Sequence, residues 1–189
     1  MMKVTKLLSV GIVLFVSLYL CGCAALVVGG GATAATVADT RGPGTVISDQ
    51  SLEHDVNSNL KGAVPNGSFT VASYSHEVLL AGQVPTAADK KAAMFAVKNT
   101  KNVKKVWNYL TIGTNESLAD ISNDTYLTSV AKTRLIGQKG VNANNIKVVT
   151  CNGVVYLLGK KSGDPVQING AIEGIRQIDG VKNVINLIH

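Results

Sequence analysis

The side chains that most often carry out chemistry are few in this chain, and none of them forms a catalytic or metal-binding pattern. His54, His76 and His189 lack the spacing of metal ligands and belong to no pattern with carboxylates or cysteines. No serine is accompanied by the base and the orienting residue that a nucleophile requires. The glycine run at 29–31 lacks the lysine and the strand–helix context of a phosphate-binding loop. We therefore expect no enzyme activity, no metal site and no dissociable cofactor.

The N-terminal segment has the pattern of an export signal. Lys3 and Lys6 precede an uncharged apolar run at 7–20 that ends in small residues. This run is too short to cross a bilayer comfortably, and its basic start is typical of a signal peptide. We expect residues 1–22 to be a signal peptide and not part of the fold.

The cysteines indicate lipidation. The sequence LCGC at 20–23 resembles the bacterial lipobox, in which a peptidase cuts before a cysteine that is then acylated. The resemblance implies that Cys23 is the lipid anchor, with a covalent N-acyl group and an S-diacylglycerol group. The alternative is an ordinary signal peptide or an uncleaved anchor helix. Cys151 would then remain alone, and we interpret it as a small apolar residue at the end of a strand.

Several acyl chains on Cys23 would hold the chain firmly at a membrane, since a single chain gives a partition constant of only about 10⁴ M⁻¹. The resemblance to sorted bacterial lipoproteins, with Ala24 after the cysteine, implies the periplasmic face of the outer membrane. Residues 23–47 are rich in Ala, Gly and Thr and are expected to form a lipidated flexible tether.

The formal net charge of the chain is +6. A basic balance favours either nucleic acid or an anionic membrane surface as partner. Export and lipidation favour phospholipid headgroups over nucleic acid. We therefore expect the partner to be an anionic phospholipid membrane.

Most of the chain is a duplicated domain. Residues 49–112 and 124–189 follow one pattern, at an offset that drifts from 75 to 78. Matched apolar positions separated by small insertions indicate a repeat and not a chance run of valines. At the start of each copy, the matched residues are Asp49, Leu52, Val56 and Leu60, then Asp124, Leu127, Ala131 and Leu135.

Each copy predicts the order helix, strand, strand, helix, strand. The first helix has apolar residues every four positions, and we expect Ser48 with Asp49, and Ser122 to Asp124, to cap it. Two alternating strands follow, joined by Asn152-Gly153 in the second copy. The second helix is expected near 87–100 or 166–178, and the last strand at 103–112 or 181–188. A single sheet with two helices on one face packs this order economically.

The strand motifs resemble the BON domain. GVVYLLG at 153–159 and GVKNVIN at 180–186 carry the match in the second copy, and VLLAG at 78–82 and VKKVWN at 103–108 carry it in the first. His76 and Asn102 depart from the usual glycines. The resemblance implies an α+β fold of two tandem BON domains, each αββαβ with a three-stranded mixed sheet and two helices on one face. The expected domains are 48–112 and 123–189, joined by a linker at 113–122.

The whole order of parts resembles the outer-membrane lipoproteins that carry two BON domains. This resemblance implies binding to anionic phospholipid, a role in outer-membrane integrity, and no catalysis. A second interpretation is a protein-interaction adaptor for the machinery that assembles outer-membrane proteins.

The two first helices differ at three neighbouring positions. Where the first copy has Ser51, Asp55 and Ser58, the second has Tyr126, Val130 and Thr133. These positions share one stripe of the helix beside its buried face. A tyrosine suits a membrane interface, because its ring enters the acyl boundary while its hydroxyl stays among headgroups.

Cations lie on or after the same helix. Lys132, Arg134 and Lys139 can meet lipid phosphates, at about 1 kcal/mol each near an anionic surface. We therefore predict that this helix contacts phospholipid. The alternative is that Tyr126 and Val130 pack against the first domain. Trp107 also has two interpretations: its side chain covers the sheet, or it forms part of a surface that binds a partner.

Overall fold

The structure is a computed structural model, which describes residues 41–113, 117–161 and 163–189. The predicted signal peptide, Cys23 and most of the predicted tether lie outside the described residues. Residues 39–189 form one compact unit. Within the described part of the chain, no helix combines the length and the apolar character needed to cross a bilayer.

Both copies fold as αββαβ, as the sequence predicts. The first domain contains α3 (Pro43–Ala63), β1 (Ser68–Tyr74), β2 (Glu77–Val84), α4 (Ala87–Lys98) and β3 (Lys105–Ile112). The second contains α5 (Leu118–Gly137), the 3₁₀ turn η2 (Ala143–Asn145), β4 (Ile146–Cys151), β5 (Val154–Gly159), α6 (Pro165–Arg176) and β6 (Asn183–Ile188). The fold class is therefore α+β, with two three-stranded sheets.

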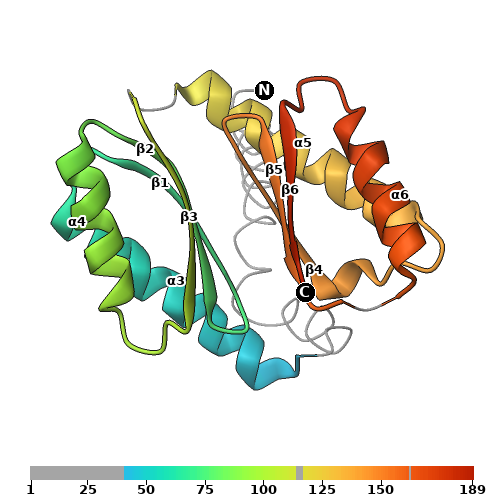
Figure 1. The fold of residues 1–189 in the computed structure, drawn as a ribbon, viewed down its shortest axis with the longest axis horizontal. Helices are drawn as coiled ribbons and strands as arrows, with labels where there is room; N and C mark the ends of the chain where they lie inside the picture. Colours follow the sequence, from blue (N-terminus) through green and yellow to red (C-terminus); the bar gives the residue numbers. More distant parts are fainter. Residues whose placement is uncertain (1–40, 114–116, 162) are drawn as a thin grey trace, which may run out of the picture. The chain divides into compact units, whose positions relative to one another are not determined.

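Each sheet is mixed, and the middle strand in space is the second in sequence. β1 pairs with β2 antiparallel and β2 with β3 parallel, and the same arrangement recurs in β4, β5 and β6. In each domain both helices lie on one face of the sheet (Figure 1). Apolar residues from the helices and from that face make one core per domain, around Leu60 and Leu80 in the first and Leu135 and Leu157 in the second.

The first helices begin earlier than the sequence predicts. α3 starts at Pro43, a residue whose fixed φ suits the first turn of a helix. α5 starts after Ser117, which forms a reciprocal capping box with Asp120. Donation from Ser117 to the exposed Asp120 carboxylate holds its pKa below the usual value. The expected caps at Asp49 and Asp124 are wrong, because both residues lie inside the helices and are buried.

These two buried aspartates instead cap the hairpin turns. Asp49 accepts hydrogen bonds from the backbone N–H groups of Ser75 at 2.7 Å and His76 at 2.8 Å. Asp124 accepts from those of Asn152 and Gly153 at 2.6 and 2.8 Å. All four turn residues have positive φ, so the two hairpins share one turn geometry despite their different sequences. A carboxylate from the helix thus stabilises a turn that Ser75 and His76 would not favour alone.

The opposite faces of the two sheets pack against each other. Buried residues of both domains form one further cluster: Ala72, Tyr74, Leu79, Ala81, Cys151, Tyr156, Leu158 and Leu187. Tyr109 and Tyr156 pair across it, with ring centroids 5.1 Å apart. We call this cluster the sheet–sheet interface. It leaves the helix layers of the two domains on opposite outer sides of the compact unit.

Candidate functional site: the first helix of the second domain

Helix α5 positions every described residue of the predicted lipid site except Lys139, which follows it. Leu127, Ala131 and Leu135 are fully buried in the domain core, which fixes the rotation of the helix and leaves its outer face in solvent. Tyr126 is 61% exposed. Its side chain therefore does not contribute to the sheet–sheet interface.

The other two residues of the predicted stripe are placed differently. Val130 is half-buried and packs against the core of its own domain. Thr133 is exposed, and its hydroxyl donates to the carbonyl of Ser129 at 2.9 Å. The alternative in which Tyr126 and Val130 pack against the first domain is thus wrong.

The predicted cations surround the C-terminal half of the helix. Lys132, Arg134 and Lys139 are all exposed. The start of α5 carries Asp120 instead, so the charge along the helix changes from acidic to basic. This order is favourable with the helix dipole and concentrates any attraction for phosphate toward Gly137.

The structure adds three apolar residues that the sequence comparison missed. Leu118, Ile121 and Ile136 are 83%, 47% and 65% exposed. Leu118 and Ile136 are 18 residues apart, which is five helical turns, so they lie on one line about 27 Å long. The signal was available in the repeat: at an offset of 75, Ile136 corresponds to Lys61 of the first domain.

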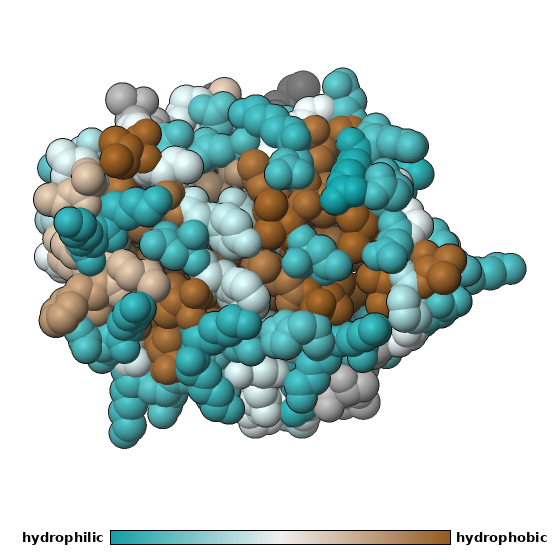
Figure 2. All heavy atoms as spheres, in the orientation of Figure 1, coloured by the Kyte–Doolittle hydropathy of each residue, from teal (hydrophilic) through white to brown (hydrophobic). Residues whose placement is uncertain are grey.

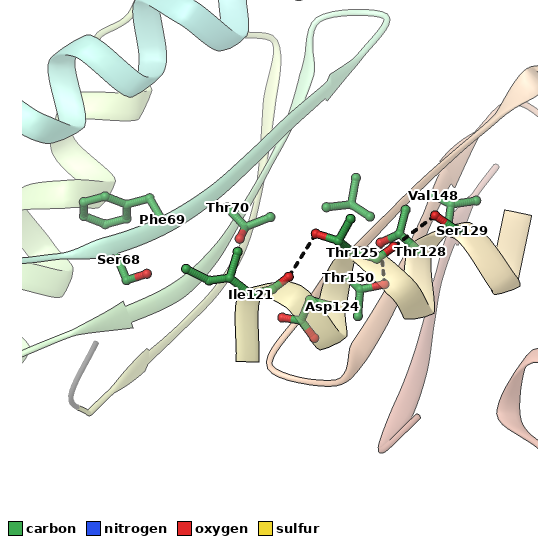
Figure 3. Close-up of a pocket in the computed structure, with 11 residues that line it drawn as sticks. Ser68, Phe69, Thr70, Ile121, Asp124, Thr125, Thr128, Ser129, Val148 and Thr150 are labelled. Carbon is green, nitrogen blue, oxygen red and sulfur yellow. Dashed lines mark hydrogen bonds between the residues drawn. The ribbon is translucent and has the colours of Figure 1, made fainter. Parts of the chain in front are cut away.

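A shallow groove of about 430 Å³ lies along α5 toward the first domain, and the exposed Ile121 is one of the residues that line it (Figure 3). Its lining is rich in hydroxyl groups, from Ser68, Thr70, Thr125, Thr128, Ser129 and Thr150. Several of these already donate within the protein: Thr125 to the Ile121 carbonyl, Ser129 to the Thr125 carbonyl and Thr128 to the Thr150 hydroxyl. Among the described residues that line the groove there is no lysine or arginine to pair with an anionic headgroup.

The remaining candidates belong to the sheet–sheet interface. Trp107 packs there, and its indole N–H donates to Glu77 at 3.0 Å, so it covers the sheet. His189 also contacts Glu77, at 3.1 Å. Lys147 pairs with Glu53 of the first domain. Cys151 ends β4 and is buried, as predicted.

Among residues 41–113, 117–161 and 163–189, no group of three or more His, Cys, Asp or Glu side chains is placed to hold a metal ion. Burial raises the pKa of Tyr156, with smaller contributions from Cys151, Tyr109 and Asp124. Tyr156 sits in the sheet–sheet interface, and this shift reflects packing there.

Comparison with known proteins identifies the family. The model of the BON domain matches residues 48–114 and 123–189. The chain is 37% identical over 190 residues to "Outer membrane lipoprotein DolP" of Haemophilus influenzae, covering 98% of this chain and 97% of that protein. It is 33% identical over 154 residues to the "21 kDa hemolysin" of Actinobacillus pleuropneumoniae, covering 80% of this chain and 78% of that protein.

Among solved structures, the C-terminal domain of CdsD, a structural protein of the type III secretion system of Chlamydia trachomatis, aligns with a TM-score of 0.32 and 16% identity. The alignment covers 71% of this chain and 94% of that domain. The family assignment comes from the two matched domains and the near full-length relative. This chain belongs to the BON-domain family and is an outer-membrane lipoprotein with two BON domains.

Proposed function

We propose that this lipoprotein is non-enzymatic, faces the periplasm and binds anionic phospholipid through α5, and that this binding supports outer-membrane integrity. Cys23 would provide the lasting attachment through its acyl chains. Helix α5 would provide a second, reversible contact with the headgroups.

The exposed apolar face of α5 carries the proposal. The described residues include eight large apolar side chains that are exposed, and four of them lie on this helix: Leu118, Ile121, Tyr126 and Ile136. Exposed apolar residues gathered on one element mark a binding surface more often than scattered ones do. An apolar helix face bordered by cations is the pattern of helices that lie in a membrane interface.

The first domain shows that the fold does not require this surface. At the positions of Tyr126 and Ile136, α3 has Ser51 and Lys61. Both helices bury the same four positions. The replacement of Ser51 by Tyr126 and of Lys61 by Ile136 is therefore not required by the shared buried positions, and the proposal attributes it to binding.

Flotation with vesicles tests the proposal. The soluble form 24–189, which lacks Cys23, is mixed with phosphatidylglycerol-containing or purely phosphatidylcholine vesicles at low and moderate salt. We expect co-flotation with the anionic vesicles only, weakened by salt because exposed charges are screened. Tyr126→Ser with Ile136→Ser should reduce the partition coefficient at least about tenfold, since apolar surface contributes about 25 cal/mol per Å².

A second variant separates charge from apolar contact. Replacing Lys132, Arg134 and Lys139 by Gln should remove most of the salt dependence, at about 1 kcal/mol per cation. Phe95→Ser is the matched control, because Phe95 is at least as exposed as Tyr126 and Ile136 but lies on α4, in the other helix layer. Flotation that survives both α5 variants, or that Phe95→Ser abolishes, would contradict the assignment to α5.

A further inference from the structure

The exposed face of α4 in the first domain carries an unusual aromatic residue. Phe95 is 72% exposed. Lys91 lies one turn before it and Lys98 one turn after it on the same side, and both are exposed. The core of the domain takes its contacts from other positions of this helix, chiefly Ala93 and Val97.

The equivalent helix of the second domain is a direct comparison. At an offset of 78, Ala93 and Val97 correspond to Ala171 and Ile175, which are buried in the same way. Phe95 corresponds to Glu173, which forms an ion pair with Arg176 on the surface of α6. The fold is therefore satisfied by a solvated charged residue at this position, and a phenylalanine there needs another explanation.

The charges around Phe95 are predominantly positive. Lys101 follows in the next turn and is exposed. The acid of this helix, Asp89, lies in the first turn and accepts a hydrogen bond from the Thr86 hydroxyl at 2.7 Å, as part of the helix cap. Figure 2 shows apolar and hydrophilic residues alternating over the region of α4. The surface therefore combines a central apolar anchor with a basic rim.

The layer arrangement limits what can reach this surface. The bare faces of the two sheets pack together, so α4 and α5 belong to helix layers on opposite sides of the unit. If α5 lies on a membrane, which is the proposed function, a flat bilayer cannot contact α4 at the same time. A second copy of the chain is also a poor occupant, because without Lys3 and Lys6 of the predicted signal peptide the chain still carries a net charge of +4.

We propose that the Lys91–Phe95–Lys98 face of α4 is a docking surface for an acidic protein partner, which inserts an apolar pocket around Phe95 and pairs its carboxylates with the lysines. Protein interfaces are enriched in aromatic residues, including Phe, and have a polar rim. The rim charges set the rate of association and its dependence on salt. The chain would then hold the membrane with one helix layer and a protein with the other.

The test is selection from a displayed library of random 16-residue peptides on the soluble form 24–189, followed by fluorescence polarisation with the synthesised peptides. We expect enrichment of peptides with net negative charge and apolar anchors. Phe95→Glu and Phe95→Ala should weaken their binding at least about tenfold, as expected for a hot-spot residue. Lys91→Gln with Lys98→Gln should weaken binding less and lower its sensitivity to salt.

Val166→Glu is the matched control, since Val166 is 71% exposed on α6 and the change adds the same charge. Tyr126→Ser with Ile136→Ser should leave peptide binding intact, so failure of the lipid proposal is seen separately. No acidic enrichment, or peptides that bind Phe95→Glu as well as the native chain, would overturn the proposal. The proposal would also be overturned if Phe95→Glu abolished binding to anionic vesicles or self-association of the chain. The partner of this α4 surface would then be a membrane or a second copy.

Discussion

At the scale of single residues, the two buried aspartates show how side chains from a helix fix a turn. Asp49 accepts from four groups, since Arg41 and the Ser73 hydroxyl join the two turn N–H groups. Arg41 also stacks on the Tyr74 ring, 4.0 Å from its centroid. Asp124 holds the turn that Asn152 and Gly153 already favour. The sequence revealed that both aspartates are equivalent, but not their role, because the hairpin residues that they bind are more than twenty residues away.

Asp49→Asn should therefore destabilise the chain more than Asp124→Asn. We expect about 2–4 kcal/mol for the first and about 1–2 kcal/mol for the second, since hydrogen bonds to charged groups contribute about 1.5–3 kcal/mol each and an amide retains part of them. Urea unfolding followed by circular dichroism measures both. Equal losses, or a larger loss for Asp124→Asn, would contradict this role for Asp49.

The first hairpin turn also offers a stabilising change. Ser75 and His76 have φ of 52° and 69°, a region that Asn and Gly adopt with less strain. Ser75→Asn with His76→Gly should raise the free energy of unfolding by about 1 kcal/mol. Thermal unfolding checks this, and a lowered melting temperature would show that the His76 side chain matters more than turn strain.

Tyr156 predicts a dependence of stability on alkaline pH. Its pKa in the folded chain lies above the ordinary value of 10.0, mainly because burial disfavours the phenolate. Its contribution is fully present below pH 10 and is lost as pH rises above that value. Stability should therefore fall above pH 10, and the fall should be shallower in Tyr156→Phe. Urea unfolding between pH 8 and 11 measures the two slopes, and identical slopes would exclude this cause.

At the scale of the element, α5 shows which features can be predicted from apolar residues that recur every four positions and which cannot. The buried positions Leu127, Ala131 and Leu135 follow directly from it, and the structure confirms them. The N-terminus was missed because Asp124 serves the hairpin while Ser117 caps the helix. The exposed apolar residues Leu118 and Ile136 were missed because they lie beyond the stripe that the comparison considered.

The two residues of the predicted stripe should differ in their effect on stability. Tyr126→Ser changes an exposed side chain and should alter the free energy of unfolding by less than about 0.5 kcal/mol. Val130→Asp places a charge against the domain core, and we expect a loss of about 2–3 kcal/mol. Urea unfolding of the two single variants tests this. Equal effects would mean that Val130 is as exposed as Tyr126.

At the scale of the whole molecule, the sheet–sheet interface joins two domains that each have their own core. One feature of the sequence indicates this interface. The run from Val78 to Ala81 is apolar without interruption, as in strands that are buried on both faces. Alternation of apolar and polar residues along a strand identifies one buried face of the sheet. What covers the other face depends on contacts between the two domains, which the pattern within one strand does not show. Leu79 and Ala81 face the second domain, while Val78 and Leu80 face the helices.

This shared interface should make unfolding a single transition for both domains. Ala81 is fully buried in it, so Ala81→Arg should force the sheets apart and produce two transitions in differential scanning calorimetry. The charge pair of Glu53 with Lys147 is partly exposed and should contribute less than about 1 kcal/mol. Two transitions in the native chain would contradict the coupling.

The membrane contact of α5 is the central claim, and paramagnetic broadening tests it most directly. Amide spectra of the soluble form 24–189 are recorded with anionic bicelles that contain nitroxide-labelled lipid. We expect broadening along α5, strongest near Tyr126 and Ile136, and none at Phe95 on α4. Broadening centred on α3 or α4, or no broadening at any helix, would contradict the account.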